Sequence, residues 1–137
     1  INKNLIPTGR LKNVKKTIYN FLHFENIGRK LNHFKNKKLN IKFKGFDNTF
    51  VVKKNNRNFV ATLKNNKSKI QVDFFSNLPG VQVYSAHNLN YKKKLFPYQG
   101  ICLETQNFPD SPNKKNFPNT LIKPNKKYTC FTKIKIN

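Results

Sequence analysis

Alternation of apolar and polar residues with a period of two is the feature that most restricts the fold of this chain. In one segment Ile70, Val72 and Phe74 fall on one face, and Gln71 and Asp73 fall on the other. Successive side chains of a strand point to opposite faces, so this pattern predicts half-buried β-strands.

The same reasoning gives a series of short strands separated by turns that are rich in Asn, Gly or Pro. We expect strands at residues 39–44, 49–53, 58–64, 68–75, 81–86, 100–106 and 128–136. The Asn-rich turns that flank the third of these predict two successive hairpins, a meander, because Asn tolerates the left-handed turn conformation.

A helical period is weak throughout the chain, and we expect no convincing helix. Asn26-Ile27-Gly28 could start at most a turn or two. The 137 residues are enough to bury a core, and no low-complexity linker divides them. We therefore predict one all-β domain over residues 1–137, an antiparallel β-sandwich or part of one.

The formal net charge of +23 suggests nucleic-acid binding as one hypothesis, because clustered cations neutralise phosphates. Only Arg10, Arg29 and Arg57 among the 28 basic residues are arginine, which is the side chain suited to bidentate phosphate and base contacts. Abundant Lys, Asn, Ile and Phe are typical of A/T-rich coding. We favour compositional drift, expect no nucleic-acid partner, and keep a basic nucleic-acid-binding module as an alternative.

Other residue types set further limits on location and cofactors. No apolar run has the length of a membrane span, so we expect no membrane association. Cys102 and Cys130 match no metal-ligand spacing, and we interpret them as buried or half-buried thiols of a cytoplasmic protein without metal or other cofactor. Methionine is absent even at position 1, so we expect that the chain begins inside a longer coding sequence or has been processed.

The acidic residues are few, and one of them occupies the middle of a predicted strand. They are Glu25, Asp47, Asp73, Glu104 and Asp110. Taken alone, Glu104 is interpreted as a solvated strand residue and Asp47 as a turn former, while Gln82 is an ordinary polar-face residue. A strand is nevertheless a rigid support of the kind that a general base requires.

Two segments make this sequence similar to a known family. Leu78–Tyr84 (LPGVQVY) and Gly100–Pro118 (GICLETQNFPDSPNKKNFP) resemble the C-terminal part of aldose 1-epimerases, also called galactose mutarotases. Gly45–Phe50 (GFDNTF) lies upstream in the expected order. The resemblance extends over essentially the whole chain and implies a β-sandwich of the galactose mutarotase type.

The resemblance also implies a function and three site residues. The family interconverts the α and β anomers of free aldoses such as galactose or glucose by acid–base opening and reclosure of the ring. Glu104 matches the catalytic base, Asp47 matches an acid that binds sugar hydroxyls, and Gln82 matches a polar residue of the sugar pocket.

Departures from the family pattern define the alternatives. Asn20 and Asn48 replace an acid and a histidine of the family, and His87 replaces an asparagine. The N-terminal part of the family, with its general-acid histidine, is not in this sequence, and we expect that part as a structural partner. A non-catalytic sugar-binding remnant is therefore the second hypothesis.

Overall fold

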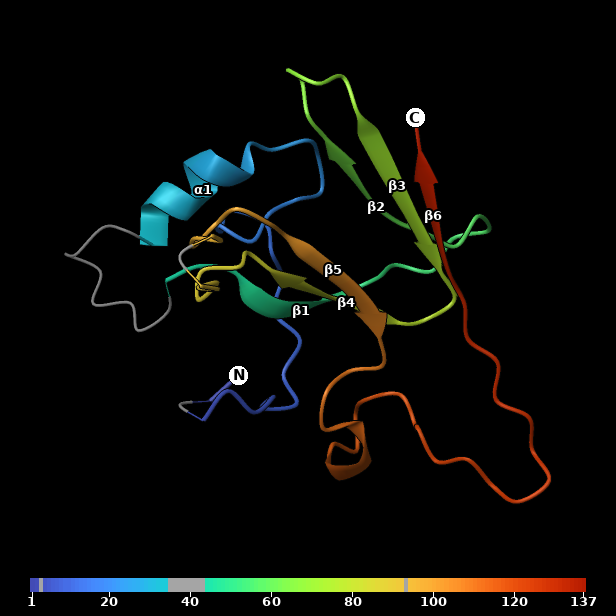
Figure 1. Cartoon of the computed structure of the whole chain (residues 1–137). Helices are drawn as coiled ribbons and strands as arrows, with labels where there is room; N and C mark the ends of the chain where they lie inside the picture. Colours follow the sequence, from blue (N-terminus) through green and yellow to red (C-terminus); the bar gives the residue numbers. More distant parts are fainter. Residues whose placement is uncertain (3, 35–43, 93) are drawn as a thin grey trace. The chain divides into compact units, whose positions relative to one another are not determined.

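The structure, a computed structural model, describes residues 1–2, 4–34, 44–92 and 94–137, and its ordered elements are mostly strands (Figure 1). In chain order they are α1 (Ile27–Phe34), β1 (Asp47–Val51), β2 (Phe59–Lys64), β3 (Gln71–Ser76), β4 (Gly80–Tyr84), β5 (Cys102–Gln106), a 3₁₀ turn η2 (Ser111–Asn113) and β6 (Thr132–Ile136). The strand expected at residues 39–44 lies, apart from Lys44, outside the described residues.

The strands form two three-stranded sheets with the orders β1-β4-β5 and β2-β3-β6. The second sheet is antiparallel, and β3 lies between β2 and β6 (Figure 1). The predicted all-β fold of antiparallel strands is confirmed, and six of the expected strands are present with shifted ends.

Only one of the two predicted hairpins is formed. β2 and β3 are joined by a turn in which the Asn65 side chain accepts hydrogen bonds from the backbone of Lys67 and Ser68. The prediction of a hairpin between β1 and β2 is wrong, because β1 pairs with β4 and β2 belongs to the other sheet. The turn itself exists, with Asn55 accepting from the backbone of Arg57 and Phe59. A period of two fixes which residues share a face, but not which sheet a strand joins.

By contact the chain divides into two compact units. Unit 1 contains Ile1–Gly9, Thr49–Gln82 and Leu103–Asn137, and unit 2 contains Arg10–Asn48 and Val83–Cys102. Each is described below by itself.

Unit 2 is built around the Phe46 ring, whose residue is fully buried. Tyr19, Phe21 and Phe34 surround this ring edge-to-face, with centroids 5.9, 5.3 and 5.0 Å away. Edge-to-face contacts add to the stabilisation that apolar burial gives. Burial also raises the pKa of Tyr19, because the ionised phenol is poorly solvated there.

Helix α1 supplies Phe34 to this cluster, so the expectation of no convincing helix is wrong. Its eight residues amount to about two turns, which is the most that the sequence allowed. Asn26 caps its first turn, since the side-chain oxygen accepts a hydrogen bond from the Arg29 backbone N–H at 2.8 Å.

In unit 1 the segment after β5 is organised around Phe108, which is buried and packs edge-to-face on Phe117 with centroids 5.1 Å apart. Ser111 donates its hydroxyl to the Phe108 carbonyl, and the Lys114 ammonium lies 2.5 Å from the Asp110 carboxylate. That ion pair and the amide of Asn113 hold the pKa of Asp110 below its ordinary range. Residues 107–118, which follow β5, are therefore held by specific side-chain contacts.

Both cysteines are free and exposed, so the expectation of buried or half-buried thiols is wrong. Cys102 lies on the exposed face of β5, and Cys130 precedes β6. No helix in the described part of the chain is long and apolar enough to cross a membrane.

Asp73 gives unit 1 an acid-sensitive contact. The pKa of its carboxyl is lowered mainly because the Thr62 hydroxyl donates to it at 2.6 Å across the β2–β3 pair. Gln71, Asn137 and the charge of Lys135 act in the same direction, while desolvation opposes them.

We expect Asp73→Asn to reduce the loss of stability at low pH. A carboxyl with a lowered pKa in the folded state stabilises above its unfolded pKa of about 3.9, and this contribution disappears as the pH falls through the folded value. Urea unfolding midpoints measured between about pH 7 and pH 2 should decline less steeply for the variant than for the wild type. Parallel curves would contradict this role of Asp73.

Candidate active site

Glu104 is the central residue of β5, and its side chain is exposed. Along this strand Cys102 and Glu104 are exposed and Leu103 and Thr105 are half-buried, so exposure alternates over these four residues, whereas Gln106 is half-buried. The Glu104 side chain forms no hydrogen bond or ion pair with other described residues. The strand therefore presents the carboxylate to solvent on a fixed backbone.

Gln82, the central residue of β4, is half-buried and is held by a neighbouring strand. The Thr49 hydroxyl of β1 donates a hydrogen bond to the Gln82 Oε1 atom at 2.5 Å. Both residues belong to unit 1.

Gly80 leaves the space in which this contact forms. A Cβ atom at Gly80 would lie 3.0 Å from the Thr49 Cγ2 atom and 3.0 Å from the Phe108 ring. Such distances are closer than ordinary van der Waals contact, so glycine is needed for the approach of Thr49 and Phe108. The Pro-Gly-Val-Gln segment thus combines a small residue with the polar side chain two positions later.

Asp47 is the first residue of β1 and is half-buried in unit 2. The adjacent Phe46 fixes its backbone, because the Phe46 N–H donates to the buried Ser85 hydroxyl at 2.9 Å. Gly45 precedes them and admits Ser85, whose Oγ would lie only 2.3 Å from a Cβ at that position. Strand β1 begins at Asp47, two residues before the expected start at residue 49. Asp47 therefore belongs to a strand and not to a turn.

His87 is buried in the same unit, and its Nδ1 atom lies 3.4 Å from the Ser85 Oγ atom. It also packs edge-to-face on Tyr84, with centroids 5.0 Å apart. His87 is thus part of the packing that surrounds Gly45. His23 and His33 are exposed.

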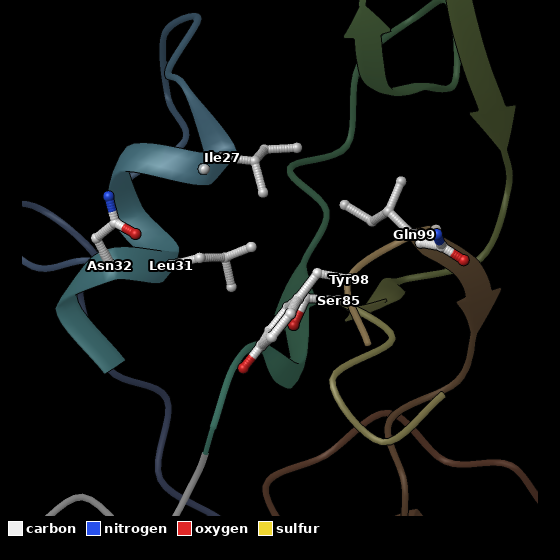
Figure 2. A pocket seen from close by; sticks show the side chains of 9 residues that line it. Ile27, Leu31, Asn32, Ser85, Tyr98 and Gln99 are labelled. Carbon is white, nitrogen blue, oxygen red and sulfur yellow. The ribbon is translucent and has the colours of Figure 1, made fainter. Parts of the chain in front are cut away.

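A pocket of about 560 Å³ lies within unit 2, between α1 and the segment before β5. Ile27 and Leu31 point from α1 toward Tyr98 and Gln99 (Figure 2). The Tyr98 hydroxyl is engaged, since it donates to the Lys44 carbonyl at 2.8 Å. None of Asp47, Gln82 and Glu104 lines this pocket, and the candidate site is defined by the strand residues instead.

The described residues contain no group of three or more His, Cys, Asp or Glu side chains placed to hold a metal ion. Thr49 is the residue that sequence reasoning missed. Its position opposite Gln82 follows from the pairing of β1 with β4, and no pattern within either segment reveals that pairing.

The fold has a counterpart among solved structures. The structure is similar to a crystal structure of a GalM/aldose epimerase homologue from C. elegans, with a TM-score of 0.83 and 19% sequence identity. The match covers 100% of this chain and 42% of that one. The chain therefore has the fold of part of an aldose epimerase-like β protein.

Sequence comparison identifies the family. The sequence model of the family described as aldose 1-epimerase matches residues 1–135, and the chain belongs to this family. It is 30% identical over 144 residues to the galactose mutarotase of Homo sapiens and 26% identical over 141 residues to the aldose 1-epimerase of Escherichia coli. These matches cover 100% and 96% of this chain. The chain spans about 40% of the length of these relatives.

Proposed function

We propose that this chain supplies the general base and part of the sugar-binding surface of an aldose 1-epimerase. Glu104 is the base, Gln82 contacts the sugar from β4, and Asp47 binds sugar hydroxyls. The substrate class is free aldoses such as galactose or glucose.

In the reaction Glu104 accepts the proton of the anomeric hydroxyl as the C1–O5 bond breaks, which leaves an open-chain aldehyde. The ring oxygen takes up a proton at the same time from a general acid, which in this family is a histidine of the N-terminal part. Rotation about the C1–C2 bond exposes the other face of the carbonyl. Reclosure returns both protons and gives the other anomer, so no atoms or electrons are gained or lost.

The observation that carries the proposal is the exposed carboxylate of Glu104 on a strand, in a chain that belongs to this family. A general base must reach its proton within hydrogen-bond distance, and a sheet holds it there with little freedom. The orientation of Gln82 by Thr49 supports the assignment of a prepared polar surface on the neighbouring strand β4.

The test is polarimetry of freshly dissolved α-galactose and α-glucose. We expect this chain alone to convert the sugars at about the rate of buffer, because the general acid typically contributes about 10²–10⁴ in rate. The same chain joined to the N-terminal part of human galactose mutarotase should accelerate mutarotation. A correctly folded joined protein without activity would contradict the proposal.

The second candidate is a non-catalytic sugar-binding remnant, and it is favoured by Asn20, Asn48 and His87, which replace an acid, a histidine and an asparagine of the family pattern. It predicts saturable galactose binding, measured by calorimetry, with no rate enhancement alone or joined. Mutarotation by either protein would exclude it.

A further inference from the structure

We propose that the outer edge of β6 is a docking site for an extended partner segment in which apolar residues alternate with acidic ones. Strand β6 (Thr132–Ile136) lies at one edge of the β2-β3-β6 sheet, and no other described strand pairs with its outer side (Figure 1). All of its residues are exposed. The edge belongs to unit 1 and does not depend on the proposed sugar site.

The backbone of β6 presents hydrogen-bonding groups on this outer side. Asn137 and Gln71 exchange both backbone hydrogen bonds, at 2.8 and 3.0 Å, so they are a hydrogen-bonded pair of the antiparallel ladder. The register continues without a shift along β6. Because hydrogen-bonded and non-hydrogen-bonded pairs alternate, Ile134 and Ile136 direct their N–H and C=O groups away from β3. An added strand can pair with these groups, which is the mode of recognition called β-augmentation.

The two edges of this sheet differ in regularity. β2, at the opposite edge, has an irregular register between Phe59 and Ala61, of the kind that interrupts pairing with a further strand. β6 has no such irregularity. At its start the Thr132 hydroxyl contacts the Thr105 hydroxyl of β5, so the stretch that a partner can reach is residues 133–136.

One face of β6 favours apolar side chains on the partner. Ile134 lies opposite Phe74 and Ile136 lies opposite Val72, so the four side chains share a face of the sheet. The two isoleucines remain 56% and 72% exposed, whereas Phe74 is buried. Apolar side chains on an added strand would remove this isoleucine surface from water, and that removal favours binding.

The other face of β6 selects the charge of the partner. Lys133 lies opposite Phe75, with its ammonium 5.9 Å from the ring centroid, and Lys135 lies opposite Asp73. The two lysines outnumber this one carboxylate, and the whole chain has a net charge of +23. A second copy of β6 that covered the isoleucines would place lysines beside lysines, and like charges on facing strands destabilise their pairing. Acidic side chains are complementary at these positions.

The probe is a synthetic peptide of alternating valine and glutamate, as long as β6 and with blocked ends. Amide hydrogen exchange followed by NMR should show fast exchange at Ile134 and Ile136 in the free chain and slower exchange at both with saturating peptide. The N–H groups of Lys133 and Lys135, which point toward β3, should change little. A peptide with lysine in place of glutamate should protect neither isoleucine. Absence of protection by the glutamate peptide, or equal protection by the lysine peptide, would overturn the inference.

A charge variant tests the role of the lysines. Lys133→Glu should weaken binding of the glutamate peptide about fivefold, the effect expected for one exposed ion pair, and should strengthen binding of the lysine peptide. Lys127→Glu is the matched control, because it replaces another exposed lysine of unit 1 and changes the net charge equally. It should leave both affinities unchanged. Equal weakening by the two variants would show that binding depends on net charge alone, and would contradict a site at β6.

Other occupants of this edge give different results in the same measurements. Protection of Ile134 and Ile136 that increases with the concentration of the chain alone, together with a dimer in sedimentation equilibrium, would identify a second copy. Protection without peptide in the protein joined to the N-terminal part of human galactose mutarotase would place the edge inside that larger domain. Either result would overturn the assignment of the edge to an acidic partner segment.

Discussion

Replacing Glu104 by Gln should lower the rate of sugar mutarotation by about 10²–10⁴-fold in a protein that joins this chain to the N-terminal part of the family. The amide keeps the size and the hydrogen-bonding reach of the carboxyl group, but it cannot take the proton of the anomeric hydroxyl. The loss should therefore appear in kcat, with KM little changed, because the contacts to the other hydroxyls remain. Polarimetry at several galactose concentrations separates the two constants.

Glu25→Gln is the matched control for this substitution. Glu25 is also an exposed glutamate, and its carboxylate lies 3.9 Å from the ammonium of Lys30, whose side chain is 13% exposed. Its replacement should leave kcat and KM unchanged. A Glu104→Gln protein with wild-type kcat would show that the base is another group.

The strands could be predicted from the sequence because their signal is local. The alternation of Val72 and Phe74 with Asp73, for example, requires only knowledge of which residues share a face. The turn at Asn65 could also be predicted, because an asparagine side chain can accept hydrogen bonds from backbone N–H groups two or three residues later, as Asn65 does here. These signals gave the β2–β3 hairpin correctly.

The pairing of β1 with β4 could not be predicted in the same way. It joins segments more than thirty residues apart, as the Thr49–Gln82 contact does. That pairing depends on the packing of Gly80 against Thr49 and Phe108, which no local period encodes. The prediction of a β1–β2 hairpin failed because a turn signal indicates a change of direction, and the chain here turns into another sheet.

The candidate site shows the same division. The family resemblance identifies Glu104, Gln82 and Asp47, and the structure gives each a defined strand position. The contact between Thr49 and Gln82 came from the structure alone. It depends on the pairing of β1 with β4, which cannot be read from residue types.

Phe46→Ala should have the largest effect on stability, a loss of about 3–5 kcal/mol. The Phe46 ring is fully buried and contacts three aromatic rings edge-to-face, so its removal leaves a cavity that aromatic neighbours cannot easily fill. A loss of this size is a large fraction of the stability of a typical domain, about 5–15 kcal/mol. Urea unfolding followed by far-UV circular dichroism measures it.

Two further variants keep this prediction decisive even if Phe46→Ala does not fold. Phe46→Leu removes less volume and should lower the unfolding midpoint by a smaller amount, while Phe24→Ala should leave it within about 0.5 kcal/mol, since Phe24 is 75% exposed. Equal effects at positions 24 and 46 would contradict the assignment of the core. Because Phe46 directly precedes Asp47, the Phe46→Leu protein should also bind galactose more weakly than the Phe24→Ala protein, which connects the aromatic core of unit 2 to the position of a proposed sugar ligand.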